Sequence, residues 1–201
     1  MYETSSEEVV EKSSPARKVL GRIFRGLYDV IESLVIAGAI VIFIYLFVAS
    51  PHEVLGRSME DNFWNGEYLL ADKVSYLFRD PVRGDVVIFK QTPTADYIKR
   101  VIGTPGDTVA VRDGSYYVNN SRLDESGYLE SAVYTDPGSF LTEGEEYTVP
   151  NGKYFVSGDN RQHSSDSRTF GPIDKSQIKG RAVFIYWPFS HLKVISRPSY
   201  N

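Results

Sequence analysis

Hydrophobic residues follow two different patterns along this chain. Residues 34–48 form an apolar run without a charge, whereas beyond Val54 short apolar stretches alternate with polar residues and turns. Extended to 31–50, with Glu32 at the interface, the run reaches the roughly 20 residues that a helix needs to cross a bilayer. The alternation is typical of β-strands, whose successive side chains point to opposite faces. The pattern predicts one apolar helix followed by a β domain.

The apolar run allows three interpretations: a cleaved signal peptide, a buried core helix or a membrane anchor. A signal peptide usually has a shorter apolar run and a small-x-small cleavage site, and the sequence at 48–51 is a poor version of that site. A core helix would show a polar stripe, but this run is apolar on all sides. We therefore expect a transmembrane anchor at 28–50, behind a tail at 1–27.

The charges that flank the anchor predict its orientation. Arg57 is the first strong cation after the run, whereas five basic residues precede it, namely Lys12, Arg17, Lys18, Arg22 and Arg25. Basic residues favour the cytoplasmic side. We expect a single-pass protein of the cell membrane, with the lipid bilayer as a partner, a cytoplasmic N-terminus and an extracellular domain at 51–201.

The pattern after the anchor predicts a mainly β domain. Strands are expected at 67–74, 85–90, 97–102, 153–157 and 181–187. A hairpin is expected at 108–118, because Asp113-Gly114 favours a tight turn. Residues 119–150 are acidic and weakly periodic, which indicates a variable excursion with short strands of its own. Together these elements predict an antiparallel barrel- or sandwich-like fold.

Composition excludes several classes of function. The net charge is −4 and the basic residues are scattered, so nucleic acid is not expected as a partner. The chain has no cysteine, and its three histidines do not lie at metal-ligand spacing. We therefore expect no metal and no cofactor.

Two residues are candidates for chemistry. Lys99 shares a strand face with Tyr97 and Val101, and apolar surroundings lower the pKa of a lysine until it can act as a base. Ser58 follows Gly56 at the end of an extended stretch, and a serine hydroxyl needs a base before it can attack. No histidine is placed for that task. Each residue alone also fits an ordinary role, as a snorkelling lysine or a surface hydroxyl.

A third segment, 157–171, is dense in short polar side chains and follows a predicted strand. With it, the motifs resemble bacterial type I signal peptidases in their short, single-anchor form, over about residues 34–188. The matching motifs, in the order of that family, are Gly56-x-Ser58-Met59, Arg83-Gly84-Asp85-Val86-Val87, Lys99-Arg100-Val101-Ile102-Gly103-x-Pro105-Gly106-Asp107 and Gly158-Asp159-Asn160-Arg161-x-x-Ser164-x-Asp166-Ser167-Arg168-x-x-Gly171. The resemblance implies a signal-peptidase fold and a serine endopeptidase that removes N-terminal signal peptides from secreted precursor proteins.

The resemblance also implies a role for each matching side chain. Ser58 would be the nucleophile and Lys99 the general base, and the Ser164 hydroxyl would orient the lysine amine. Outside the chemistry, two ion pairs would shape the site: Asp159 with Arg100 and Asp166 with Arg168. Met59 would line an apolar substrate rim, and an ordinary packing role for it is equally open.

One departure from the family pattern leaves alternatives open. The family usually has Pro-Thr where this chain has Asp61-Asn62. A carboxylate near the nucleophile would favour the protonated lysine, so we expect a slower enzyme with an alkaline optimum. A weak or inactive homologue that assists pilus or surface-protein assembly is the alternative. A self-cleaving repressor of the SOS type is disfavoured by the anchor and by the absence of a DNA-binding helical region.

Overall fold

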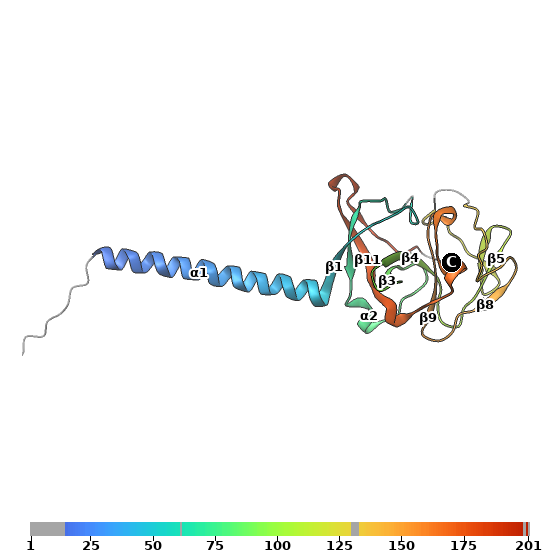
Figure 1. Ribbon diagram of the computed structural model, residues 1–201, viewed down its shortest axis with the longest axis horizontal. Coiled ribbons are helices and arrows are strands. Elements are labelled where there is room, and N and C mark those ends of the chain that lie inside the picture. The colour runs from blue at the N-terminus through green and yellow to red at the C-terminus, as the bar shows by residue number, and fades with distance from the viewer. Residues whose placement is uncertain (1–14, 61, 130–132, 199, 201) are drawn as a thin grey trace, which may run out of the picture. The chain divides into compact units, whose positions relative to one another are not determined.

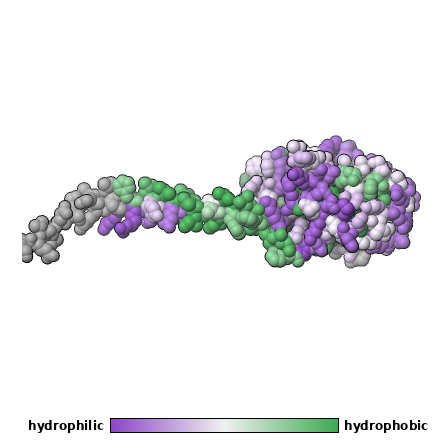
Figure 2. Space-filling model, turned by 60° about the horizontal axis from the view of Figure 1, so that its bottom comes forward, coloured by the Kyte–Doolittle hydropathy of each residue, from purple (hydrophilic) through white to green (hydrophobic). Residues whose placement is uncertain are grey.

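The computed structural model describes residues 15–60, 62–129, 133–198 and 200. The chain forms two compact units that divide after Phe43. The first contains helix α1 (Pro15–Phe43), and the stretch Phe24–Val48 is long and apolar enough to cross a membrane (Figure 1). Of the predicted tail, residues 1–14 lie outside the described residues and 15–27 belong to α1. The later part of the apolar stretch has a hydrophobic surface, whereas its first turns also show hydrophilic residues; the visible face of the second unit is largely hydrophilic (Figure 2).

The second unit begins with the end of the apolar stretch. A π-helical turn (Ile44–Val48) leads directly into strand β1 (Ala49–Glu53). Lys73 holds this junction: its backbone N–H donates to the Val48 carbonyl at 3.0 Å, and its Nζ donates to the Tyr45 carbonyl at 3.1 Å. The last carbonyls of a helix have no intrahelical partner, so the lysine satisfies groups that would otherwise remain unpaired. Consequently residues 49–50, which we expected at the end of the anchor, pair with a neighbouring strand.

A large antiparallel sheet forms the centre of this unit, in the order β1-β2-β11-β3-β4-β9-β10, with β12 paired to β11. Its remaining strands are β2 (Tyr68–Asp72), β3 (Val86–Lys90), β4 (Asp96–Gly103), β9 (Lys153–Ser157), β10 (Ile173–Asp174), β11 (Ile178–Trp187) and β12 (Lys193–Val194). Short helices α2 (Ser75–Phe78) and α3 (Ser167–Phe170) lie between strands. Within the described residues the sheet does not close into a barrel.

A smaller antiparallel sheet has the order β7-β6-β5-β8. Its strands are β5 (Thr108–Arg112), β6 (Ser115–Val118), β7 (Ser121–Arg122) and β8 (Glu146–Thr148). A shared apolar cluster joins the two sheets, with Ile102 and Phe155 from the large sheet against Val109 and Tyr116 from the small one. The mainly β, sandwich-like fold class is therefore confirmed, and the excursion 119–150 supplies both edges of the small sheet.

Strand β3 explains why charged residues of β4 are buried. Val86 and Ile88 pack into one apolar cluster, while Val87 and Phe89 pack into another on the opposite face. A strand buried on both faces reads as a continuous apolar run instead of an alternating one. Its neighbour β4 therefore also lies inside the unit, and its residues from Ile98 to Gly103 are buried on both faces of the strand.

Candidate active site

The ammonium group of Lys99 lies beside the hydroxyl of Ser58. Its Nζ donates to Ser58 Oγ at 2.7 Å and to the Ile98 carbonyl at 3.0 Å, and the residue is only 3% exposed. Burial lowers the pKa of Lys99 to about 8, although the carboxylates of Asp166 and Asp159 act in the opposite direction. An amine with a pKa near the ambient pH, within hydrogen-bond distance of a hydroxyl, can accept the proton of that hydroxyl.

A short turn holds Ser58 in front of the lysine. Met59 and Phe63 are each 2% exposed and pack into the core cluster beneath β2 and β3. The N–H of Phe63 donates back to the Met59 carbonyl at 2.9 Å, which closes the turn. Gly56 precedes the turn with a φ of +92°, a conformation that glycine adopts without strain. Burial of Met59 therefore fixes the turn, while the Ser58 side chain remains partly exposed.

Gly158 allows the polar segment 157–171 to approach the Ser58 turn. A Cβ atom at this position would lie 2.3 Å from the Ser58 carbonyl oxygen and 2.3 Å from Ser164 Oγ. No side chain fits there. The next residue but one, Asn160, donates its backbone N–H to the same Ser58 carbonyl at 3.1 Å. The glycine thus permits a backbone contact between two segments that are far apart in the sequence.

Ser164 lies beside these groups without contacting the lysine. Its Oγ is buried and makes no hydrogen bond within the described residues. It is still close enough to Asp166 to help lower the pKa of that carboxyl group. The orienting contact with Lys99 that the family resemblance implies is therefore not formed in this structure.

Two buried ion pairs hold the surroundings of the site. Arg100 Nε and Nη2 donate to the two carboxylate oxygens of Asp159 at 2.8 and 2.6 Å. Arg168 Nε and Nη2 donate to Asp166 at 2.8 and 2.8 Å, and Asp166 also accepts from the Gly158 N–H at 3.1 Å. Both pairings have the partners expected from the sequence. The second pair ties the position of Gly158 to that of α3.

The excursion 119–150 contributes contacts that sequence reasoning missed. Arg161 is 2% exposed, forms an ion pair with Glu125 and donates to Thr135 Oγ1 at 2.7 Å. The centroid of the Tyr128 ring lies 4.0 Å from the guanidinium carbon of Arg100. The sequence carried one signal for these contacts. Arg161 lies inside a recognised motif but had no assigned partner, and the excursion is rich in acidic residues that could pair with it.

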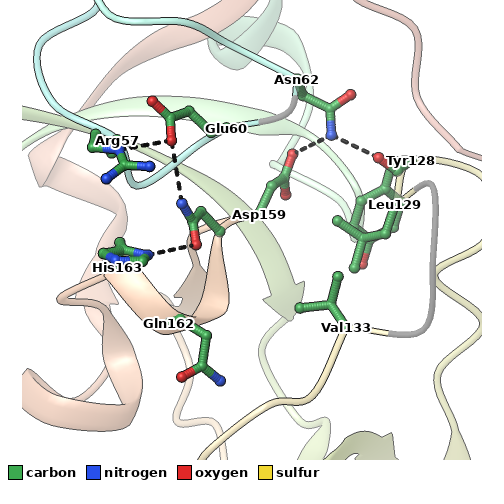
Figure 3. Close-up of a pocket in the computed structure, with 10 residues that line it drawn as sticks. Arg57, Glu60, Asn62, Tyr128, Leu129, Val133, Asp159, Gln162 and His163 are labelled. Carbon is green, nitrogen blue, oxygen red and sulfur yellow. Dashed lines mark hydrogen bonds and ion pairs between the residues drawn. The ribbon is translucent and has the colours of Figure 1, made fainter.

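A groove adjoins Ser58, and a smaller cavity lies beside the neighbouring Arg57. A groove of about 560 Å³ runs past Ser58 and Lys99 between residues 52–59 and residues 94–99. A cavity of about 250 Å³ is lined by the side chains shown in Figure 3. Arg57 and His163 line both. Within the described residues, no three His, Asp or Glu side chains lie together as a metal site would need.

Comparison with known proteins identifies the family of the chain. The model of the family described as "Signal peptidase, peptidase S26" matches residues 27–187. The chain belongs to this family. The resemblance noted in the sequence is thereby confirmed, and membership supports signal peptide removal as the activity. The apolar helix fits the membrane anchoring of such a signal peptidase.

Individual signal peptidases match most of the chain. It is 35% identical over 183 residues to signal peptidase IB of Staphylococcus aureus (strain MRSA252), covering 86% of this chain and 95% of that protein. It is 34% identical over 171 residues to signal peptidase I of Bacillus licheniformis, covering 83% and 92%. A crystal structure of a signal peptidase I from Enterococcus faecalis is 31% identical, covers 51% of this chain and 97% of that one, and has a TM-score of 0.40. The family assignment rests on the family model and the two sequence relatives.

Proposed function

We propose that this protein is a membrane-anchored serine endopeptidase that removes N-terminal signal peptides from secreted precursors by a Ser58/Lys99 dyad. The supporting observation is the 2.7 Å contact between Ser58 Oγ and the buried Lys99 Nζ. The family supplies the substrate class, and the groove that runs past Ser58 offers space for an extended peptide.

The reaction follows from the properties of the two groups. Neutral Lys99 takes the proton of Ser58 as Oγ attacks the carbonyl carbon of the scissile bond. The Ser58 N–H supplies one donor for the oxyanion of the tetrahedral intermediate. The lysine ammonium then protonates the leaving amine, which leaves the signal peptide as an ester on Ser58. Water attacks this ester with Lys99 again as the base, and hydrolysis releases the signal peptide and restores the serine.

The remaining predicted residues support this chemistry without entering it. We assign Ser164, whose buried Oγ makes no hydrogen bond within the described residues, as the group that orients the Lys99 amine during the reaction. The Arg100–Asp159 and Arg168–Asp166 pairs hold the walls of the site, and Met59 forms part of the floor of the groove.

The anchor places the enzyme where its substrates emerge. We assign the N-terminus to the cytoplasm, the anchor to the apolar stretch that ends at Val48, and the β domain that begins with β1 to the outside of the membrane. A precursor is itself held in the bilayer by its apolar signal peptide, so anchoring the enzyme raises the effective concentration of the precursor at the active site.

A cleavage assay tests the proposed function. The full chain in lipid vesicles should convert a signal-bearing precursor to its mature size, and mass spectrometry should find the new N-terminus directly after a small-x-small site. A matched precursor with a bulky residue just before the cut should remain intact. A chain that binds the precursor but never cuts it would be an inactive homologue instead, and the proposal would be wrong.

The pH dependence of cleavage should report the base. Only neutral Lys99 accepts a proton, so kcat/KM should rise as the pH increases through about 8, the pKa of Lys99. The measurement is kcat/KM on an uncharged peptide substrate between about pH 5 and pH 10. A rising limb centred near pH 6 would instead indicate a histidine, and would contradict the assignment of Lys99. The predicted effect of Asp61 on this optimum concerns a position outside the described residues.

A further inference from the structure

The side-chain amide of Asn62 connects three segments of the site. Its Nδ2 donates one hydrogen bond to the Tyr128 carbonyl at 2.6 Å and another to Asp159 Oδ2 at 2.9 Å, as Figure 3 shows. Its backbone N–H donates to the Met59 carbonyl at 3.0 Å, so Asn62 is also part of the turn that carries Ser58. One residue therefore joins this turn, the excursion 119–150 and the polar segment 157–171.

The chemistry of these contacts requires a donor with two protons. Both partners are acceptors: Tyr128 offers a carbonyl oxygen, and Asp159 offers a carboxylate that is fully buried. An amide NH₂ supplies two donors from one nitrogen, whereas a hydroxyl supplies one and a carboxylate supplies none. Asparagine at this position is thus matched to its two partners.

The same two partners also hold Arg100. Asp159 Oδ2 accepts from Arg100 Nη2 at 2.6 Å, and the Tyr128 ring lies 4.0 Å from the guanidinium carbon. Arg100 directly follows Lys99 on β4 and donates to the Gly84 carbonyl at 3.1 Å. Asn62 therefore links the turn of the nucleophile to the strand of the base through two shared contacts, away from the reacting atoms.

We propose that Asn62 is a positioning residue that fastens the Ser58 turn to Asp159 and Tyr128 and so keeps Ser58 Oγ within reach of Lys99 Nζ. This role rests on the proposed function. The second donor of the asparagine supplies a tether that a threonine hydroxyl cannot provide in full.

Substitution of Asn62 by an acidic residue of the same shape tests the role. Asn62→Asp should lower kcat by about 100-fold, because a carboxylate facing Asp159 and the Tyr128 carbonyl pushes the turn away from Lys99. KM should stay within about threefold, because Asn62 does not itself line the groove that runs past Ser58 and Lys99. Asn62→Thr keeps one donor and should retain most of the activity. A merely structural role would lower the melting temperature without this separation of kcat from KM.

A neighbouring asparagine provides the matched control. Asn65 uses its Oδ1 to accept from the Gly56 N–H at 2.8 Å, and an aspartate keeps that acceptor. Asn65→Asp adds the same charge to the same loop and should leave kcat unchanged. The assays use the full chain in detergent micelles with a soluble peptide, well below the melting temperature of each variant. If Asn62→Asp does not fold, Asn62→Ala removes both donors without adding a charge and should show the same loss of kcat.

The outcomes of these assays distinguish a failure of the positioning role of Asn62 from a failure of the proposed function. A folded Asn62→Asp or Asn62→Ala variant with wild-type kcat overturns the positioning role, and so does a loss that lies entirely in KM. In both cases wild-type activity would leave the proposed function intact. A wild-type chain and an Asn65→Asp variant that are both inactive would refute the proposed function, and this role with it.

Discussion

Ser58→Ala and Lys99→Arg should each reduce precursor cleavage to near the uncatalysed background. The alanine variant lacks the nucleophile. The arginine variant keeps a cation in the site, but a guanidinium stays protonated at every accessible pH and cannot take the Ser58 proton. Loss of a general base alone lowers rates by about 100- to 10,000-fold. Single-turnover cleavage of a precursor by the full chain in vesicles measures the loss.

The controls for this experiment distinguish chemistry from folding. Lys153→Arg, in an exposed ion pair with Asp174, should leave the rate unchanged. Because an arginine is larger than the buried lysine, Lys99→Met provides a second variant without a charge and should be equally inactive. Urea unfolding should show that Ser58→Ala is as stable as the wild type. A Lys99→Arg variant that keeps more than about a tenth of the rate would mean that another group is the base.

Asp166→Ala should lower the free energy of unfolding by about 3–5 kcal/mol, the cost of leaving a buried charge without its partner. Arg168 is 4% exposed and would keep its charge after the substitution. The carboxylate also accepts from the buried Gly158 N–H at 3.1 Å, so a second buried donor would lose its partner. Urea unfolding of the full chain in detergent micelles measures the effect.

An exposed ion pair gives the reference value for this change. Asp174→Ala removes the partner of Lys153 at the surface, and should change stability by less than about 1 kcal/mol. Equal effects of the two substitutions would show that the buried pair contributes no more than a surface pair.

The buried pair of Asp166 and Arg168 also predicts a loss of stability in acid. Burial alone would raise the pKa of Asp166, but the hydrogen bonds and charge of Arg168 outweigh it and hold the pKa below the usual value of 3.8. A carboxyl with a lowered folded-state pKa stabilises the fold above its unfolded pKa, and this stabilisation disappears as the pH falls through the folded value. Asp166→Ala should therefore flatten the dependence of stability on pH below about 4.

Local patterns predicted most strands but not the arrangement around the site. Strand β9 matches its predicted range because its apolar run ends abruptly at polar residues on both sides. Strand β1 could not be predicted, because Pro51, His52 and Glu53 show no alternation and only pairing with β2 makes them extended. Its first residues were read as the end of the anchor for the same reason.

Sequence motifs predicted the groups that are proposed to react, but they did not predict the groups that hold those residues in place. Ser58 and Lys99 stand in recognisable segments, and their neighbours Arg100 and Asp166 were assigned partners by resemblance. Asn62 was noticed only as a departure. Its contact with Tyr128 joins positions 66 residues apart, and no local pattern reports a contact of that range.

The consecutive residues Lys99 and Arg100 point to opposite faces of β4, and this has a consequence for folding. A slip of the strand by one residue would exchange their faces and set a permanent cation beside Ser58. In that arrangement Arg100 would lose both Asp159 and the Gly84 carbonyl, and the buried charges of Arg100 and Asp159 would be left unpaired. The arginine therefore helps to select the register of β4. Only the register in which the guanidinium keeps its partners places the amine of Lys99, which can give up its proton, beside Ser58.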